Sequence, residues 1–418
     1  MEMVEKFKNL HYGWIIVAAG FIIMGAGLGI VYNVSSLFVN PISEELGFSR
    51  SQANAFFTIR AICQVIAFLL AKKIYQKIRI RRLMQVVTVT LILSFFSYSL
   101  MNDNVLIFYL ITFVSSMSVS LLTILPLSII ISNWFAEKRG FAVGIAFMGS
   151  GIGGMIFNAL TGQWLVSLGW RATYQVLSLI IAVLIIPMTF FVIRTEPIEK
   201  GLKPYGYKEK KQVNGKFLEE SGLTFKEVIV STRFWLISVS SILLMLGING
   251  IMAMTGPHLR DLGYSVGFSA NIVALSMGAL AIGKVVVGRL FDTIGSRGAI
   301  TASSVAAILG LIGLLFAEYN IALAAIIVGT GIGAAYGSIA NTMIAVDLYG
   351  RKDYNAVFGI LSAVGTTGAI VGPIIIGNIY DITGSYNAAL KIAIICGIIA
   401  VTLFQFTLKK PYPKDQIA

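Results

Sequence analysis

Two cationic side chains, Lys284 and Arg60, fall deep inside long apolar stretches of this sequence. All 19 acidic residues, in contrast, fall in polar segments or at the ends of apolar ones. A charged side chain at the centre of a membrane helix costs roughly 2.5–3.5 kcal/mol on insertion scales, so such residues usually face a polar space and serve a function. Because the sequence places no carboxylate beside either cation, the pattern predicts that a bound anion neutralises them.

The composition indicates which class of protein must hold these cations. The chain has 418 residues, of which 57% are hydrophobic and 12% are charged, whereas soluble proteins carry about 25% charged residues. An intrinsically disordered chain would instead have few hydrophobic and many charged residues. The net charge of +13 does not indicate a nucleic-acid partner, because the basic residues are spread over the short gaps between apolar runs. We therefore expect an all-α polytopic membrane protein that contacts the lipid bilayer and binds no nucleic acid.

Catalytic and metal-binding spacings are missing from the sequence. It has two histidines, no HExxH motif and no cluster of carboxylates. Cys63 and Cys396 are far apart in apolar segments and form no CxxC pair. We expect no enzyme activity, no metal and no other cofactor. His258, near the end of an apolar run, is interpreted as a surface histidine whose hydrogen bonds are satisfied, rather than as a proton relay.

Twelve apolar runs are long enough to cross a bilayer, which takes about 20 residues. They comprise residues 12–38, 51–71, 83–101, 105–132, 140–167, 172–193, 233–257, 268–290, 298–317, 321–346, 354–379 and 386–408. With both termini in the cytoplasm, 26 of the 32 Lys and Arg residues lie on the cytoplasmic side, as the positive-inside rule requires. The exceptions are Arg50, Arg171, Arg260 and Lys391 outside, and Arg60 and Lys284 within spans. The sequence thus predicts a multi-pass protein of the plasma membrane.

A long polar stretch divides the spans into two groups of six. We expect an N-terminal six-helix bundle over residues 1–193, a cytoplasmic linker over 194–232 and a C-terminal six-helix bundle over 233–418. The linker mixes charges of both signs, which is typical of a mobile tether at its start. From Leu223 onward, apolar and charged residues alternate, which favours a short amphipathic helix on the membrane surface.

The two halves carry an internal repeat. Trp134-Phe-Ala-Glu-Lys-Arg-Gly precedes the fifth span, and Leu348-Tyr-Gly-Arg-Lys-Asp precedes the eleventh. Each places two cations before an Ala-Val pair and leads into a glycine-rich helix. Duplicated bundles of this kind can rock about a shared central site.

The loop after the eighth span reads Gly288-Arg-Leu-Phe-Asp292-Thr-Ile-Gly295-Ser-Arg297. It resembles the G-x-L-x-D-x-x-G-x-[RK] signature of the major facilitator superfamily, which implies twelve transmembrane helices in two pseudo-symmetric six-helix bundles. Gly295 suits a sharp turn, and Asp292 can pair with a helix N-terminus or a cation. The resemblance implies that Asp292 and Arg297, with Arg139 in the other half, belong to an inner gate.

Within that superfamily the chain is similar, over nearly its whole length, to the oxalate:formate antiporter and monocarboxylate transporter relatives. The similar segments are Tyr12-Gly13-Trp14, Asn40-Pro41-Ile-Ser-Glu-Glu-Leu-Gly-Phe-Ser, Trp134-Phe-Ala-Glu-Lys-Arg-Gly, Arg233-Phe-Trp, Asp261-Leu-Gly-Tyr-Ser and the glycine-rich eleventh span. Lys284 stands where that family carries its substrate-binding arginine. The second cation of oxalate exchangers is missing from the eleventh span, where the chain reads Ser362-Ala-Val364-Gly365. The resemblance therefore favours a monocarboxylate with an apolar tail over oxalate.

Together these features predict a monomeric secondary active transporter of small organic anions, with lactate- or pyruvate-like monocarboxylates as substrates and protons as the candidate coupling ion. We expect alternating access, with Lys284 binding the carboxylate and Arg60, Asn33 and Tyr336 assisting near the bilayer midplane. Two other functions stay open: an exchanger of dicarboxylates or formate, and a carrier of an uncharged solute. Lys284 could instead extend to the headgroups, and the other three could serve contacts between helices. The sequence does not decide between symport and exchange.

Overall fold

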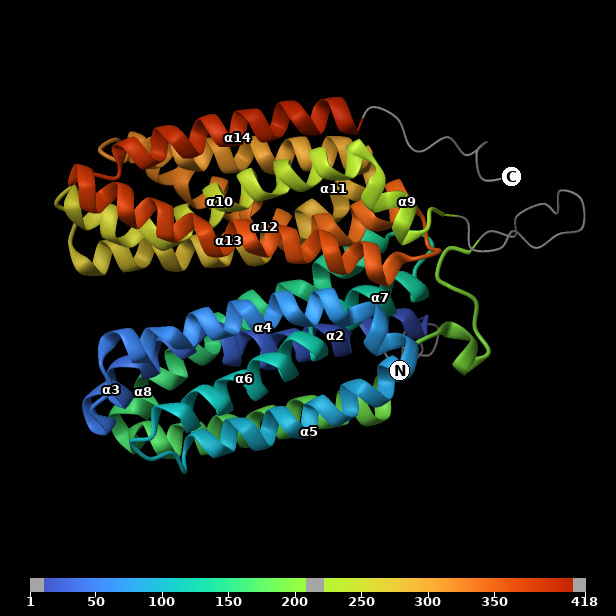
Figure 1. Ribbon diagram of the computed structural model, residues 1–418, viewed down its shortest axis with the longest axis horizontal. Helices are drawn as coiled ribbons and strands as arrows, with labels where there is room; N and C mark the ends of the chain where they lie inside the picture. Colours follow the sequence, from blue (N-terminus) through green and yellow to red (C-terminus); the bar gives the residue numbers. More distant parts are fainter. Residues whose placement is uncertain (1–10, 208–221, 409–418) are drawn as a thin grey trace, which may run out of the picture. The chain divides into compact units, whose positions relative to one another are not determined.

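The computed structural model describes residues 11–207 and 222–408, which are almost entirely helical (Figure 1). Ten helices in these ranges are long and apolar enough to cross a membrane. Two of them, α8 (Arg139–Pro187) and α11 (Val266–Leu315), have 49 and 50 residues, or about 75 Å at 1.5 Å per residue. Each is interrupted by a glycine with positive φ, Gly169 (φ 76°) in α8 and Gly295 (φ 72°) in α11. Both helices therefore double back at the predicted turns, which confirms the twelve-helix fold.

The described chain forms two compact units. Unit 1 comprises residues 11–63 and 73–207, and unit 2 comprises residues 64–72 and 222–408. Besides α8, unit 1 is built from α2 (Tyr12–Leu28), η1 (Gly29–Asn33), η2 (Ser35–Phe38), α3 (Val39–Leu46), most of α4 (Arg50–Lys77), α5 (Ile80–Tyr98), α6 (Val105–Leu122), α7 (Ile124–Trp134), η3 (Met188–Val192) and η4 (Pro197–Lys200). Besides α11, unit 2 contains α9 (Phe225–Val230), α10 (Thr232–Asp261), α12 (Asn320–Tyr349), α13 (Tyr354–Thr383) and α14 (Asn387–Thr407).

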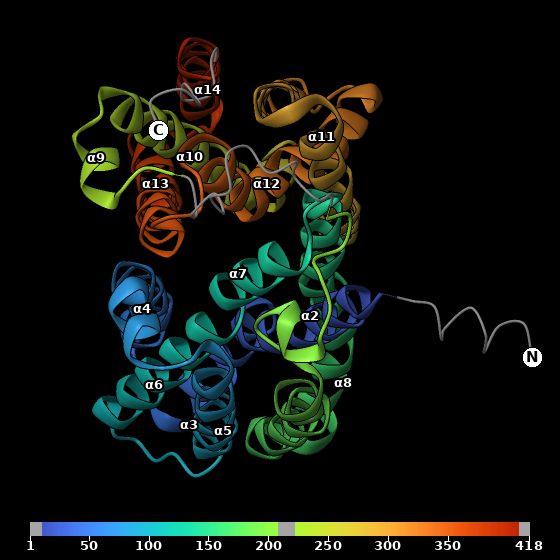
Figure 2. The ribbon, with the colours of Figure 1, turned by 90° about the vertical axis from the view of Figure 1, so that its right-hand side faces the viewer.

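Glycine sets how closely α2 and α8 approach in unit 1, where the two helices lie side by side (Figure 2). A Cβ atom added at Gly149 would collide with the carbonyl group of Phe21, and one added at Gly153 would collide with the carbonyl of Gly25. Lipid offers helices no hydrophobic driving force to associate, so small residues that allow backbones to meet stabilise the contact.

Gly153→Ala is therefore expected to destabilise the protein by about 1–3 kcal/mol, because the added methyl group forces α2 and α8 apart. The matched control is Gly162→Ala in the same helix, where an added Cβ meets nothing within 4 Å. Thermal unfolding of the purified protein in detergent measures the difference. Equal melting temperatures for the two variants would contradict the assignment of this contact.

Two of the predicted spans contain a break in the helix. The first changes after Leu28 into the π-helical turn η1 and then the 3-10 turn η2. The fourth breaks at Thr123, which has the non-helical angles φ −104° and ψ −103°. The predicted spans over 12–38 and 105–132 each correspond to one span of the structure, Tyr12–Leu46 and Val105–Trp134, with an irregular turn inside it.

The start of the predicted linker, residues 194–207, belongs to unit 1. The N–H of Tyr205 donates to the carbonyl of Trp134 (2.8 Å), and the N–H of Ala136 donates to the carbonyl of Tyr205 (2.9 Å). The ring of Tyr205 also meets the rings of Trp14 and Phe135, at 5.7 and 5.6 Å between centroids. The expectation of a mobile tether is wrong for this part of the linker, because backbone pairing and aromatic contacts hold it to the loop between α7 and α8.

The repeated loop of unit 2 makes a related contact with the chain that enters α9. The N–H of Leu223 donates to the carbonyl of Tyr349 (2.9 Å). Asp353 accepts from the N–H of Phe225 (2.8 Å) and from Nζ of Lys72 (3.0 Å). Partial burial opposes ionisation of Asp353, but these two donors lower its pKa below the usual value.

Asp353→Asn is expected to cost about 1 kcal/mol of stability, because the ion pair is partly exposed and hence screened by solvent. Since the pKa of Asp353 is lowered in the folded protein, its contribution is complete above the unfolded-state pKa of about 4 and is lost as the pH falls through the lower folded-state value. Thermal unfolding from pH 7 downward tests this. The difference in melting temperature between the wild type and Asp353→Asn should persist to about pH 4 and shrink below it. A difference that grew on acidification would contradict the prediction.

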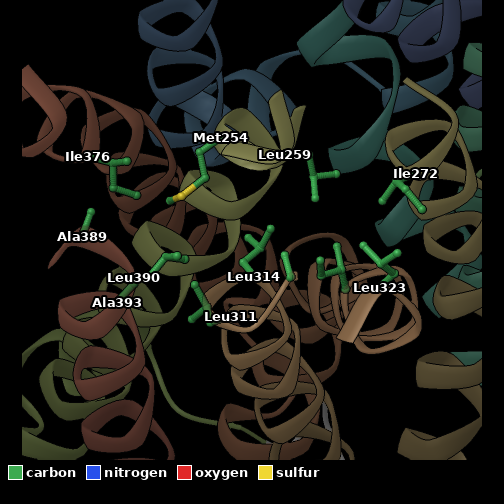
Figure 3. Packing of buried hydrophobic residues seen from close by; sticks show 12 residues of the cluster. Met254, Leu259, Ile272, Leu311, Leu314, Leu323, Ile376, Ala389, Leu390 and Ala393 are labelled. Atoms are coloured by element: carbon green, nitrogen blue, oxygen red, sulfur yellow. The ribbon is translucent and has the colours of Figure 1, made fainter. Parts of the chain in front are cut away.

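The hydrophobic core at one end of unit 2 joins α10, α11, α12, α13 and α14 (Figure 3). Leu259, Leu314 and Leu390 are completely buried in it. His258 lies beside this core and is 5% exposed, and its Nε2 is 2.9 Å from the carbonyl oxygen of Leu314. The interpretation of His258 as a surface histidine is therefore wrong, although its hydrogen bond is satisfied.

Candidate functional site

The two broken spans of unit 1 lie next to each other. A Cβ atom at Gly27, just before the π-helical turn, would approach Cγ2 of Thr123 to 2.8 Å. The hydroxyl groups of Tyr32 and Ser120 are 3.5 Å apart. Irregular turns inside membrane helices expose backbone groups and often mark the binding sites of transporters. The region around these two breaks is therefore the candidate binding region of unit 1.

Arg60 on α4 projects into this region. It is 5% exposed, its Nη1 donates a hydrogen bond to Oγ of Ser35, and its guanidinium lies 3.8 Å from the ring centroid of Tyr32. The ring of Phe56, one helical turn earlier, lies 5.0 Å away. Aromatic faces attract cations, and these partners are all neutral. Within residues 11–207 and 222–408 Arg60 forms no ion pair.

Asn33 belongs to the same irregular segment. Its Nδ2 donates to the carbonyl of Ser150 on α8 (3.0 Å), and its side chain packs over Gly154. The structure therefore brings two of the predicted site residues, Arg60 and Asn33, to one region through Tyr32 and Ser35. Sequence reasoning did not identify Ser35 and Phe56 as partners of Arg60. The position of Phe56, four residues before Arg60 on a predicted helix, was a usable signal.

The predicted residues of unit 2 lie on α11 and α12. Lys284 is 7% exposed, and it follows Gly283, whose backbone packs directly against Gly331 of α12. Tyr336 is 1% exposed and its hydroxyl is 2.9 Å from Oγ of Ser241 on α10. Lys284 is thus held in a closely packed part of the unit, and Tyr336 is joined to α10.

A further buried polar atom lies on α12, the helix that carries Tyr336. Oδ1 of Asn341, a residue that is 7% exposed, has no hydrogen-bond partner among the described residues. A buried acceptor without a donor is costly, so this amide is a candidate contact for a bound molecule. The sequence singled out Asn341 as a polar residue within a span but did not indicate this environment.

The three predicted gate residues have different surroundings. Asp292 is exposed on α11. Nε of Arg297 donates to Oε1 of Gln405 on α14 (2.8 Å), and Nε of Arg139 donates to the carbonyl of Phe135 one turn earlier (3.3 Å). Their role in a gate stays a prediction.

Twelve passes, adjacent broken helices and buried cations are features of a membrane transporter. The sequence profile described as Major Facilitator Superfamily matches residues 17–343 and 238–417. The chain belongs to this superfamily, whose members transport small solutes across membranes and are not enzymes.

Individual relatives are distant. The chain is 39% identical to riboflavin transporter RibJ of Trypanosoma brucei brucei over 66 residues, which are 16% of this chain and 12% of that protein. It is 26% identical to the uncharacterised MFS-type transporter YhjX of Escherichia coli over 72% of each chain. Monocarboxylate transporter 13 of Rattus norvegicus is 22% identical over 65% of this chain and 60% of its own length.

The fold also matches solved structures of the superfamily. A crystal structure of the E. coli fucose:proton symporter FucP superposes with a TM-score of 0.68, covering 96% of this chain and 100% of that one at 12% identity. At this identity the match shows the shared fold.

Proposed function

We propose that this protein is a secondary active transporter of small organic anions, with lactate- or pyruvate-like monocarboxylates as its substrates. The observation that carries the proposal is the guanidinium of Arg60, which is buried beside two broken spans among neutral partners. A cation desolvated in this way is stabilised by an anion. A carboxylate suits it because a guanidinium can donate two parallel hydrogen bonds to both oxygens.

Lys284 supplies the second charge of the proposed mechanism. A buried lysine presents a compact ammonium that attracts a carboxylate and can also release its proton. We propose that Lys284 binds the substrate carboxylate, with Arg60, Asn33 and Tyr336 assisting. Membership in the monocarboxylate transporter-like group is supported by the similarity to monocarboxylate transporter 13. The proposed cycle is proton-coupled, because the ammonium of a buried lysine such as Lys284 can release and regain a proton.

Counterflow in liposomes tests the substrate class. Purified protein is reconstituted into vesicles loaded with unlabelled lactate, pyruvate, formate, acetate, oxalate, riboflavin or fucose, and uptake of the corresponding labelled compound is followed. We expect accumulation of lactate or pyruvate above that of the other solutes. Accumulation of oxalate or formate alone would favour the exchanger, and accumulation of riboflavin or fucose without any carboxylate would reject an anion substrate.

An imposed pH gradient separates proton symport from exchange. If protons are co-transported, an inwardly directed proton gradient should drive net lactate uptake into empty vesicles. Uptake that requires a carboxylate inside, whatever the pH gradient, would instead indicate obligatory exchange.

We further propose that both termini are cytoplasmic in the plasma membrane, that the protein acts as a monomer, and that Asp292, Arg297 and Arg139 belong to an inner gate. The orientation is supported by the 26 basic residues that it places inside. Protease protection of a C-terminal tag in sealed right-side-out vesicles tests it.

A further inference from the structure

Two arginine side chains donate hydrogen bonds to backbone carbonyls at the C-terminal end of η3 in unit 1. Nη2 of Arg81, from the first turn of α5, donates to the carbonyl of Phe190 (2.7 Å). Nη1 of Arg194 donates to the carbonyls of Phe191 (3.0 Å) and Ile193 (2.9 Å). The last carbonyls of a helix have no partner within it and attract cations. Two guanidiniums from different elements are therefore fixed at adjacent carbonyl groups of one helix end.

Both guanidiniums keep donors for a further ligand. Each carries five N–H donors in a rigid planar arrangement, and the bonds to η3 engage one nitrogen of each. Nε of Arg81 is buried and has no hydrogen-bond partner among the described residues. A buried donor of this kind is costly unless something accepts from it. The planar arrangement of arginine donors matches the oxygens of a phosphate group.

The surroundings are positively charged and apolar. Arg79 and Arg82 are exposed at the start of α5, whose first turn contains no acidic residue. The nearest acids along the chain, Glu196 and Glu199, serve the local backbone: Oε1 of Glu199 accepts from the N–H groups of Thr195 (2.8 Å) and Glu196 (3.1 Å), and the side chain of Glu196 completes the capping box of η4.

One of the residues whose carbonyl binds these arginines carries an exposed apolar side chain. Phe191, whose carbonyl accepts from Arg194, exposes 72% of its surface at the end of a transmembrane helix. A large exposed aromatic group in this position is suited to the boundary between headgroups and acyl chains. At this boundary lipid surrounds the ring, so the anion most available to the two arginines is a phospholipid headgroup rather than a soluble phosphate compound.

We propose that this end of unit 1 is a binding site for an anionic phospholipid. Arg81 and Arg194 hold the phosphodiester, Arg79 and Arg82 add attraction for the negative headgroup, and an acyl chain covers Phe191. The site is separate from the proposed carboxylate site, and its test does not depend on transport.

Native mass spectrometry of the purified, delipidated full-length protein tests the proposal. Phosphatidylglycerol should be retained in preference to phosphatidylcholine of the same chain length. The double variant Arg81→Gln, Arg194→Gln should weaken phosphatidylglycerol binding by about 10-fold or more, because charge-assisted hydrogen bonds are lost. Arg289→Gln, an exposed arginine on α11 of unit 2, is the matched control and should bind as the wild type does.

Two additional measurements keep the test decisive if the double variant does not fold. Arg79→Gln, Arg82→Gln leaves the bonds to η3 intact and should reduce the preference for phosphatidylglycerol over phosphatidylcholine. Inorganic phosphate should not displace the bound lipid. The proposal is overturned if the folded double variant retains phosphatidylglycerol as the wild type does, or if the Arg79, Arg82 variant keeps the wild-type preference for this lipid. It is also overturned if Arg289→Gln loses phosphatidylglycerol binding to the same extent as the double variant, or if inorganic phosphate displaces the lipid.

Discussion

Lys284→Gln is expected to reduce lactate or pyruvate uptake in reconstituted vesicles by about 30-fold or more, because removing one partner of a buried charge pair costs at least about 2 kcal/mol. Glutamine keeps most of the length of the side chain and its ability to donate a hydrogen bond, but it lacks the charge. Since Lys284 is 7% exposed, solvent ions cannot replace that charge. Initial uptake rates over a range of substrate concentrations measure the effect.

Lys73→Gln is the matched control, because Lys73 is exposed on α4 and takes no part in the proposed site. It should transport at the wild-type rate. The melting temperature and the elution profile in detergent must show that Lys284→Gln is folded. A folded Lys284→Gln protein whose uptake stays within a few-fold of the wild type would remove Lys284 from the substrate site, while leaving the assignment as a transporter intact.

Arg60→Lys is expected to lower uptake by about 10-fold although the charge is kept, because an ammonium cannot stack on Tyr32 as a guanidinium does or donate two parallel hydrogen bonds to a carboxylate. The same change should lower the melting temperature, because a buried cation loses its bond to Ser35 and part of its contact with the aromatic faces. Uptake kinetics and thermal unfolding are measured on the same preparation.

The tyrosine that Arg60 contacts provides the control. Tyr32→Phe keeps the aromatic face 3.8 Å from the guanidinium and loses the hydroxyl, which makes a weak contact with Ser120 at 3.5 Å and also interacts with Arg60. It should transport nearly as well as the wild type, whereas Tyr32→Leu should resemble Arg60→Lys. If Arg60→Lys lowers stability but leaves the concentration for half-maximal uptake unchanged, Arg60 supports the fold and does not contact the substrate.

The positions of the membrane spans could be predicted from the sequence because span length is a property of consecutive residues. A bilayer requires about 20 apolar residues in a row, and the turns must use residues that tolerate unusual backbone angles. Gly169 and Gly295 are such residues: each lies between two apolar runs and has a positive φ where the chain reverses.

The breaks within spans could not be predicted in the same way. Asn33, Ser35 and Ser36 make the first break more polar than the helix Tyr12–Leu28, which contains no Asn or Ser, but a polar residue within a span does not by itself mark a break in the helix. The structure shows that the two breaks contact each other: Gly27 lies against Thr123, and the hydroxyl of Tyr32 lies near that of Ser120. These contacts join residues from different spans, and they do not follow from periodicity along the chain.

The sequence by itself determined that this is a membrane protein with twelve spans and two buried cations, because hydrophobicity and charge act residue by residue along the chain. The tertiary structure decided what surrounds each cation. Arg60 lies among Tyr32, Ser35 and Phe56, and Arg81 and Arg194 donate to successive carbonyls at one helix end. These neighbours come together only when separate helices pack, and the electrostatic environment of a buried charge is set by the groups within a few ångströms of it.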